Sequence, residues 1–229
     1  MTTHRFFVAP EAMSGERFPL PVAIERQVRS VLRLGAGDRI VLLAGDGSEA
    51  TCRLEGGACV VEDRRPAAGE PRHRLTIIQA LLKGDALEEV VQHATEIGVA
   101  AFRLVVTERS VTRDMSARKL DRLRAIAREA AEQSERGIVP SIAEPIPLSS
   151  AFEPDAVLLY ERQDGSRLGE LAPASSVVIG PEGGFSDREV DAARAAGVAL
   201  AGLGPRILRS ETVAVAAAAV ILSRTGDFA

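Results

Sequence analysis

The sequence predicts an α/β protein in two parts, in which a small β-barrel-like domain precedes a mostly parallel sheet covered by helices. Residues 1–62 contain short β-like runs separated by glycine-rich turns, which is typical of small β domains. After residue 72, apolar runs alternate with segments of helical periodicity, as expected for strands buried on both faces of a sheet. Hydrophobic residues make up 46% of the 229 residues, which is enough for a sizeable core.

The first part, residues 1–70, is predicted to be rich in β-structure. Its β-like runs lie at 5–9, 39–44, 50–54 and 59–62. Between the first two runs, Ile24, Val28 and Leu32 recur at helical spacing and predict a helix near 22–32. The polar segment 63–72 contains two prolines and a glycine, and it is the candidate boundary between the domains.

The second part, residues 71–229, alternates strands with helices. Strands are predicted at 75–82, 102–107, 156–160, 177–180 and 198–203. Helices are predicted at 85–97, 116–136, 186–196 and 211–223. Gly98 closes the first of these helices, and Ser186 with Glu189 forms a capping box at the start of the third. The last helix is apolar on every side, so it must be buried in a core or against a partner.

Charge is distributed unevenly along the chain. The formal net charge of −4, taken alone, argues against a nucleic-acid partner. Residues 1–40 carry six basic and four acidic side chains, residues 103–136 carry nine and six, and residues 140–200 carry four and ten. This distribution fits either one positive face directed to a polyanion or a solvated surface of uneven charge.

We expect no metal site and no membrane span. The spacing of Cys52 and Cys59 fits no zinc pattern, and the histidines lie far from them in the sequence. The first ten residues lack the apolar core of a signal peptide, and the longest apolar run, 213–222, is too short to cross a bilayer. The expected location is therefore a reducing cytoplasm.

Two loops near the C-terminus are the strongest candidates for a binding site. The segment Gly-Pro-Glu-Gly-Gly at 180–184 follows a predicted strand, and Leu-Gly-Pro-Arg at 203–206 follows the next one. Glycines allow the backbone of such loops to approach a ligand, although each loop taken alone fits a tight turn equally well. The P-loop and dinucleotide-binding signatures are both absent. The two loops together predict a pocket lined by backbone rather than by side chains.

Several further segments accompany these loops in a fixed order. They are Gln-Ala-Leu-Leu-Lys-Gly-Asp at 79–85, Glu-Ile-Gly-Val at 96–99, Glu-Arg at 108–109, Glu-Ala-Ala-Glu-Gln-Ser at 129–134 and the extended second loop at 203–212. In this order they resemble the RsmE family of ribosomal RNA small subunit methyltransferases, within the SPOUT superfamily. The stretches at 4–8 and 29–34 resemble its N-terminal domain. Where many members have a His-His pair, this chain has Glu25, Arg26 and Gln27.

The resemblance implies a fold and an activity. The fold would be a PUA-like RNA-binding β-barrel at 1–70 and a SPOUT α/β domain at 71–229, with a mostly parallel sheet and a deep trefoil knot. The activity would be methylation of N3 of a uridine near the 3′ end of 16S rRNA in the small ribosomal subunit, with S-adenosylmethionine as methyl donor. The enzyme is expected to be a homodimer whose active site draws on both subunits.

The resemblance also implies which residues hold the cofactor. They come mainly from the two glycine loops and are expected to act largely through their backbone. The set is Leu159, Ile179, Gly180, Pro181, Glu182, Gly183, Gly184, Leu203, Gly204, Ile207, Leu208, Arg209 and Thr212. Adenine would lie among the residues at 179–180, 203 and 207–208, and the loop 180–184 would hold the rest of the cofactor.

Arg209 and Glu211 are the expected catalytic residues. N3 of uridine is not nucleophilic until it loses its proton, and the resulting negative charge spreads onto O2 and O4. The guanidinium of Arg209 stays charged and offers a planar set of donors for that charge. Glu211 has three alternative roles: it orients Arg209, it accepts the proton, or it stabilises the N-terminus of the last helix.

Arginine and lysine residues are the candidates for RNA phosphate contacts. The set is Arg5, Arg26, Arg33, Lys83, Arg109 and Arg136. Each is alternatively a solvated surface cation. Two other functions compete with the leading one, namely a SPOUT methyltransferase for another RNA, such as a tRNA ribose, and a non-catalytic ribosome-assembly factor that has lost the cofactor.

Overall fold

The computed structural model describes residues 3–161 and 166–228, which group into two compact units. The first unit comprises Met1–Glu70 and Ala131–Val139, and the second comprises Pro71–Ala130 and Pro140–Ala229. The division after Glu70 lies inside the polar segment 63–72. The segment Ala131–Val139, by contrast, groups with the first unit although it lies far along the sequence.

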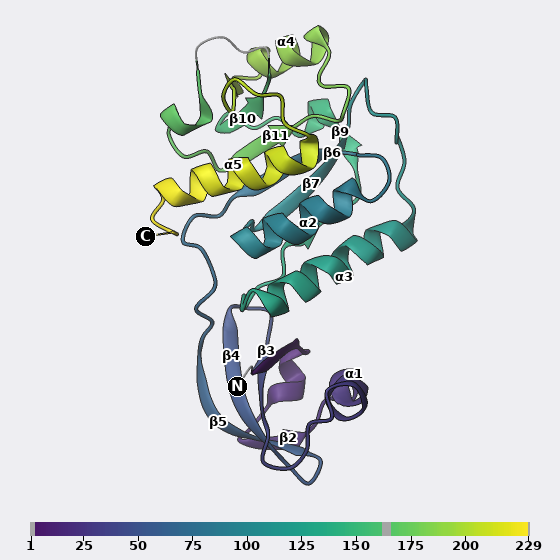
Figure 1. The fold of residues 1–229 in the computed structure, drawn as a ribbon, viewed down its shortest axis with the longest axis vertical. Coiled ribbons are helices and arrows are strands. Elements are labelled where there is room, and N and C mark those ends of the chain that lie inside the picture. Colours follow the sequence, from purple (N-terminus) through teal and green to yellow (C-terminus); the bar gives the residue numbers. More distant parts are fainter. Residues whose placement is uncertain (1–2, 162–165, 229) are drawn as a thin grey trace. The chain divides into compact units, whose positions relative to one another are not determined.

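The first unit contains an open five-stranded sheet (Figure 1). Its order is β1 (His4–Phe7), β3 (Arg39–Leu43), β4 (Ser48–Glu55), β5 (Ala58–Pro66) and β2 (Arg17–Pro19). Strands β1 and β3 are parallel, and the other neighbours are antiparallel. The edge strands β1 and β2 do not pair with each other in the described residues, so the sheet is not a closed barrel.

The remaining elements of the first unit are helical. They are the 3-10 turn η1 (Pro10–Met13), the helix α1 (Val22–Arg26) and the π-helical turn η2 (Gln27–Val31). The predicted helix near 22–32 is therefore present, with its second half in a π conformation. Val28 and Ile24 from this helix pack with Phe6, Ile40 and Cys52 in the core of the unit.

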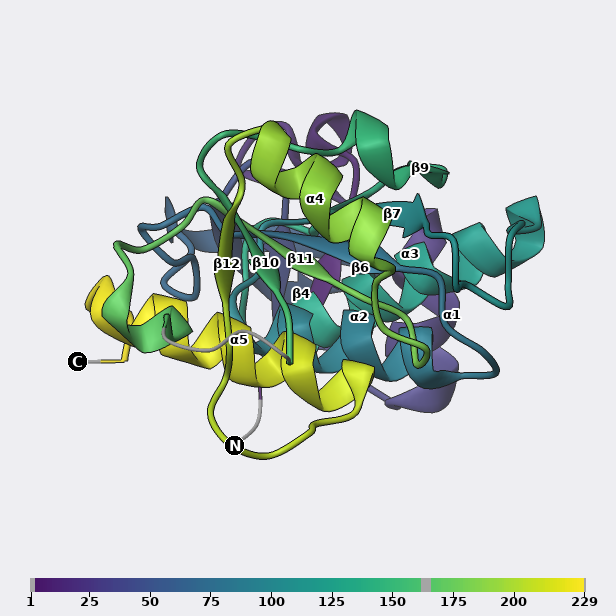
Figure 2. The same ribbon diagram turned by 90° about the horizontal axis from the view of Figure 1, so that it is seen from above.

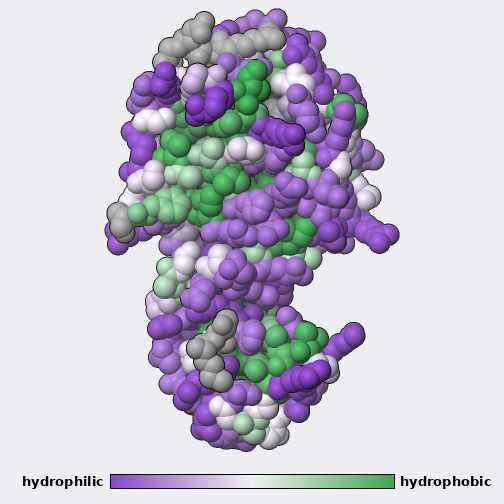
Figure 3. All heavy atoms as spheres, in the orientation of Figure 1, coloured by the Kyte–Doolittle hydropathy of each residue, from purple (hydrophilic) through white to green (hydrophobic). Residues whose placement is uncertain are grey.

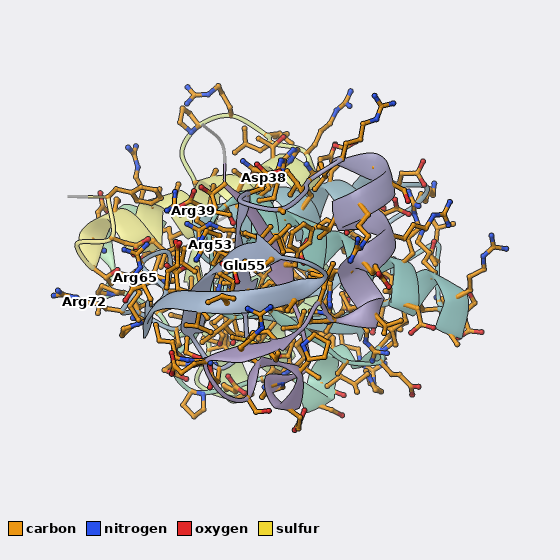
Figure 4. The ribbon with its side chains drawn as sticks, turned by 90° about the horizontal axis from the view of Figure 1, so that it is seen from below. Asp38, Arg39, Arg53, Glu55, Arg65 and Arg72 are labelled. Atoms are coloured by element: carbon orange, nitrogen blue, oxygen red, sulfur yellow. The ribbon has the colours of Figure 1, made fainter. Side chains whose placement is uncertain are left out.

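The other face of this sheet is covered by the returning segment. Phe7, Val41 and Leu43 pack there against Ala131 and Val139. Segment 131–139 is thus part of the core of the first unit. The uncovered part of the sheet carries charged side chains, and Arg39 lies opposite Arg53 on the neighbouring strand (Figure 4). Both arginines form ion pairs with the carboxylate of Glu62. The hydrogen bond that the Glu62 carboxylate accepts from Arg39 lowers the pKa of that carboxylate.

The second unit is built around a parallel seven-stranded sheet, which confirms the predicted mostly parallel arrangement. The main order is β12 (Ala199–Ala201), β10 (Ala156–Leu159), β11 (Ser176–Ile179), β6 (Thr76–Ala80), β7 (Ala101–Val106) and β8 (Ser141–Ile142). Strand β9 (Ile146–Pro147) also pairs with β7. All of these pairs are parallel.

Helices cover both faces of this sheet. They are α2 (Ala86–Ile97), α3 (Ala117–Gln133), α4 (Asp187–Ala195) and α5 (Ser210–Arg224), with short 3-10 turns η3 (Leu148–Ser150) and η4 (Leu168–Glu170). Viewed from above, α4 lies on one side of the strands, and α2 and α5 lie together on the other (Figure 2). Val190 and Ala193 of α4 pack on Ile78, Leu158 and Val178 of the sheet. No helix in the described ranges combines the length and apolar character needed to cross a membrane.

The predicted elements agree with the structure except at short or irregular places. The capping box at α4 is confirmed, because Ser186 Oγ accepts from Glu189 N and the Glu189 carboxylate accepts from Ser186 N. Strand β5 continues to Pro66, into the segment predicted to be a linker. The short strands β2, β8 and β9 were not predicted, because two or three residues carry no readable periodicity.

Candidate functional site

The candidate site lies beyond the carboxyl ends of the central strands of the second unit. Because the strands are parallel, the loops that follow β10, β11 and β12 meet at one edge of the sheet. There they form a pocket of about 540 Å³. Its lining comes from three stretches, namely the end of β10 with residues 159–161, the loop after β11 and the segment that leads from β12 into α5, together with Ala86 at the start of α2.

Most of the predicted cofactor-binding residues line this pocket. They are Leu159, Ile179, Gly180, Pro181, Glu182, Gly184, Leu203, Gly204, Ile207, Leu208 and Arg209. Gly183 and Thr212 are not among the lining residues, although each is adjacent in sequence to residues that are. The structure thus brings the two glycine loops together around one cavity.

Other lining residues were not predicted from the sequence. They are Ala86, Tyr160, Glu161, Phe185, Gly202, Arg206, Ser210 and Val213, together with Glu211, which was predicted as catalytic rather than cofactor-binding. Most of them are adjacent in sequence to the predicted residues, so extending each predicted loop by one or two residues would have included them. Ala86 is the exception, because it begins α2 and nothing in its local sequence connects it with the C-terminal loops.

The pocket walls combine apolar side chains and loop backbone with the charged residues Glu161, Glu182, Arg206, Arg209 and Glu211. Leu159 and Ile179 form buried parts of the wall, whereas the side chain of Ile207 is 86% exposed at the surface. Gly180 lies directly against the ring of Phe185: a Cβ at this position would lie 3.1 Å from a ring carbon. Gly204 has a φ of +104°, a conformation that side-chain-bearing residues rarely adopt. Glycine is therefore favoured at Gly180 by close packing and at Gly204 by backbone conformation.

Arg209 and Glu211 are located where α5 begins. Arg209 is the N-cap residue of this helix, and its side chain is 88% exposed. The Arg209 Nη1 atom lies 4.0 Å from Glu211 Oε1, and the Glu211 side chain is only 22% exposed. The pair is therefore close enough for an ionic interaction, while the guanidinium remains accessible to a ligand above the pocket.

The loop 180–184 is tied to two neighbouring loops that carry predicted RNA-binding residues. Glu182 Oε1 accepts a hydrogen bond from the backbone N–H of Lys83, 2.9 Å away. Arg109 Nη1 donates to the carbonyl oxygen of Gly183 at 3.2 Å. Both Lys83 and Arg109 are exposed. The structure thus places these two cations beside the pocket loop.

The predicted RNA-binding arginines of the first unit differ in their exposure to solvent. Arg26 and Arg33 are exposed. Arg5, in contrast, is ion-paired with Glu49 and Glu135, and its side chain is only 10% exposed. Arg136 is 1% exposed and donates to Glu70. Both guanidinium groups are buried in ion pairs within the first unit and are not free to contact a phosphate in this conformation, so we do not retain Arg5 and Arg136 as RNA contacts.

The described residues form no metal-binding cluster, and their two cysteine thiols are buried. No group of three or more histidine, cysteine, aspartate or glutamate residues in the described ranges is arranged to hold a metal ion. Both cysteines are unpaired and buried in the first unit. Burial raises the pKa of Cys52 to about 12 and that of Cys59 to about 11, so both thiols stay protonated and unreactive at neutral pH.

Comparison with known proteins gives consistent matches. The family model described as RNA methyltransferase domain matches residues 69–222. Ribosomal RNA small subunit methyltransferase E of Synechocystis is 34% identical over 95% of this chain and 77% of its own length. The protein of the same name from Bacillus subtilis is 33% identical over 86% of each chain.

Solved structures match over nearly the whole chain. Ribosomal RNA small subunit methyltransferase E from Neisseria gonorrhoeae, crystallised with S-adenosylmethionine, superimposes with a TM-score of 0.88 at 29% identity, covering 97% of this chain and 98% of that one. A putative methyltransferase of Legionella pneumophila, also solved with bound S-adenosylmethionine, gives a TM-score of 0.85 at 28% identity and covers 98% of both chains.

Proposed function

The chain belongs to the ribosomal RNA small subunit methyltransferase E family, and from that premise we propose that it methylates N3 of a uridine near the 3′ end of 16S rRNA. It is a methyltransferase that acts on ribosomal RNA with S-adenosylmethionine as cofactor. The position of the methyl group on the base is the finer part of the proposal.

The observation that carries the proposal is the pocket formed by the two glycine loops. Its volume of about 540 Å³ lies within the usual range for cofactor sites. Its lining combines leucine and isoleucine side chains with exposed loop backbone, which suits an adenine ring that needs both apolar contact and hydrogen-bonding groups. When bound there, S-adenosylmethionine supplies an electrophilic methyl group on a positively charged sulfur.

The backbone would do most of the binding. Ile179, Gly180, Leu203, Ile207 and Leu208 are the residues that we assign to the adenine, and the loop 180–184 is assigned to the remainder of the cofactor. Leu159 and Arg209 also border the pocket. Thr212 lies one residue beyond the lining residue Glu211, on the same helix.

Arg209 would then act on the uridine. Removal of the N3 proton leaves negative charge on O2 and O4 of the base, and an exposed guanidinium at the mouth of the pocket is suited to stabilise it. Glu211 lies 4.0 Å from this guanidinium. Its carboxylate either accepts the N3 proton, orients Arg209 or stabilises the helix N-terminus.

Each unit carries exposed cations that are suited to contact RNA. Lys83 and Arg109 adjoin the loop 180–184, so they are suited to contact phosphates that flank the target base. Arg26 and Arg33 are exposed on the first unit. We propose that this unit is a PUA-like RNA-binding domain, and its resemblance at 4–8 and 29–34 supports that assignment.

A knot in the second unit is a further part of the proposal. Strand β12 is at the edge of the sheet, yet residue Ser210, nine positions after this strand ends at Ala201, bonds to groups at the ends of the central strands β6 and β11. The chain must therefore cross from the sheet edge to its middle beside the loop that follows β11. That course is compatible with a C-terminal segment threaded as in SPOUT proteins.

We also propose a cytoplasmic homodimer. Helix α5 has buried residues such as Ala214 and Ala218, whereas Val213, Ala216 and Val220 on its outer side are only half-buried. Apolar atoms gather over α5 on the face drawn in Figure 3. An apolar helix face of this kind is suited to pack against a second copy of the chain.

Calorimetric titration with S-adenosylmethionine tests the cofactor assignment. We expect saturable binding to one site per chain and no comparable heat from ATP, which shares the adenosine but lacks the methionine portion. Absence of saturable binding would overturn the proposal and favour a ribosome-assembly factor that binds RNA without catalysis.

A further inference from the structure

Gln79 is a buried polar residue in an otherwise apolar strand. Strand β6 reads Thr-Ile-Ile-Gln-Ala, and it lies between β11 and β7 in the centre of the parallel sheet. The Gln79 side chain is 0% exposed, and its neighbours across the sheet are Ile179 and Leu104. Because a buried amide is unfavourable unless it is hydrogen-bonded, its partners indicate why an amide occupies this position.

The partner of Gln79 is a serine at the start of α5. Gln79 Nε2 donates to Ser210 Oγ at 3.0 Å and also to its neighbouring carbonyl, that of Ala80, at 3.1 Å. Ser210 is 8% exposed, and its hydroxyl in turn donates to the carbonyl oxygen of Gly180 at 2.7 Å. The serine hydroxyl is thus acceptor and donor in one continuous chain of hydrogen bonds, which strengthens both.

This chain joins three segments that are distant in sequence. It begins at the carboxyl end of β6, passes through the first residue of α5 and ends on the loop that follows β11. Gly180 also packs closely against the ring of Phe185, because a Cβ at Gly180 would lie 3.1 Å from a ring carbon. The position of the Gly180 peptide is therefore fixed between the aromatic ring and the serine hydroxyl.

The same series of hydrogen bonds fixes the residues on either side of Ser210. Arg209 and Glu211 flank this serine, and all three residues line the pocket. A shift of Ser210 relative to Gly180 would therefore change the distance between the two pocket loops and move the guanidinium with them. We propose that Gln79 and Ser210 are positioning residues that set the separation of the two loops, an inference that rests on the proposed cofactor site.

The side-chain amide of Gln79 does not contribute all the stability that a fully hydrogen-bonded amide would. Gln79 Oε1 is buried and has no hydrogen-bond partner among the described residues. A buried unpaired carbonyl destabilises the fold, so an unbranched apolar side chain such as methionine would relieve that cost while it removes the donor to Ser210. The positioning role therefore predicts that stability and function respond differently to Gln79→Met.

The test compares Gln79→Met, Ser210→Ala and Ser210→Thr in the full chain. In Gln79→Met we expect an unchanged or higher Tm, together with cofactor affinity weakened about 10-fold by calorimetry. Ser210→Ala should weaken cofactor binding at least as much. Ser210→Thr keeps the hydroxyl, so this variant should bind the cofactor about as tightly as the parent protein. Ser176→Ala is the matched control, because it removes another buried serine hydroxyl at the opposite end of β11.

Hydrogen exchange in the cofactor-free protein separates this inference from the proposed function. If the residues position the loop, backbone amides at 182–185 exchange faster in Gln79→Met and Ser210→Ala than in the parent protein and in Ser176→Ala. Unchanged exchange at these amides, or a fall in Tm that accounts for the whole loss of affinity, would overturn the inference. Lack of cofactor binding by the parent protein would count against the proposed function alone, because the exchange result does not depend on it.

Discussion

Arg209 is the residue on which the proposed chemistry most depends. Its side chain is exposed at the pocket mouth and is placed by the first turn of α5. If it stabilises negative charge on the uracil, Arg209→Ala should leave S-adenosylmethionine affinity within about 3-fold and lower kcat by about 10² to 10³. Calorimetry and single-turnover methyl transfer measure the two quantities separately.

The control for Arg209 is another exposed arginine that does not line the pocket. Among the described residues, Arg194 on α4 forms an ion pair with Asp191 on the same helix, so Arg194→Ala should leave both affinity and turnover unchanged. If Arg209→Ala abolishes cofactor binding, then Arg209 is a cofactor-binding residue and its assignment to the base is wrong.

Gly180 is the residue at which the pocket backbone is most tightly packed. A Cβ there would lie 3.1 Å from the Phe185 ring, closer than ordinary van der Waals contact. Gly180→Ala should therefore displace the loop and weaken cofactor binding about 10-fold, with a smaller effect on Tm. Addition of Phe185→Leu, which replaces the ring by a smaller aliphatic side chain, should recover some of the affinity. An affinity equal to that of the parent protein would mean that the Gly180 backbone does not contact the cofactor.

For some single residues, the sequence alone did not predict whether the side chain is buried or exposed. Arg5 and Arg136 have the same side chain as Arg26 and Arg33, yet the first two are buried in ion pairs with Glu49 and Glu70. Their partners lie tens of residues away in the sequence, so charge patterns cannot distinguish a buried ion pair from an exposed phosphate contact. The hydrogen-bonded chain from Gln79 to Gly180 was missed for the same reason.

At the scale of elements, long periodic segments were predictable and short ones were not. The apolar runs at β6, β10 and β11 identified buried parallel strands, and the capping box located the start of α4. The edge strand β2 has only three residues and was not predicted. Strand β5 extends into a segment rich in arginine and proline, because its pairing with β4 outweighs the local composition.

Helix α5 carries the prediction about assembly. Ala216 lies on its half-buried outer side, so Ala216→Glu would place a charge in the proposed dimer interface. We expect light scattering to report a dimer for the parent protein and a monomer for this variant. Ala125→Glu, on the exposed side of α3, is the matched control and should remain dimeric. A monomeric parent protein at all concentrations would exclude this interface.

At the scale of the whole molecule, the division into two units followed from composition, but their exact membership did not. The polar segment 63–72 indicated a boundary, and the division falls after Glu70. Segment 131–139 groups with the first unit because Ala131 and Val139 pack on its sheet and Glu132 accepts from the N–H of Phe7. Such long-range packing leaves no local signal in the sequence. Likewise, the glycine turns suggested a barrel, whereas the strand pairing is that of an open sheet.

The proposed activity is methylation of one uridine of 16S rRNA at N3. The most direct test incubates the purified protein and labelled S-adenosylmethionine with small ribosomal subunits from cells that lack the endogenous enzyme, and then maps the labelled nucleotide by mass spectrometry. We predict a single methyl group on N3 of one uridine near the 3′ end, with Arg209→Ala nearly inactive in parallel. Absence of label in 16S rRNA, or a methyl group on a ribose or another base, would contradict the account.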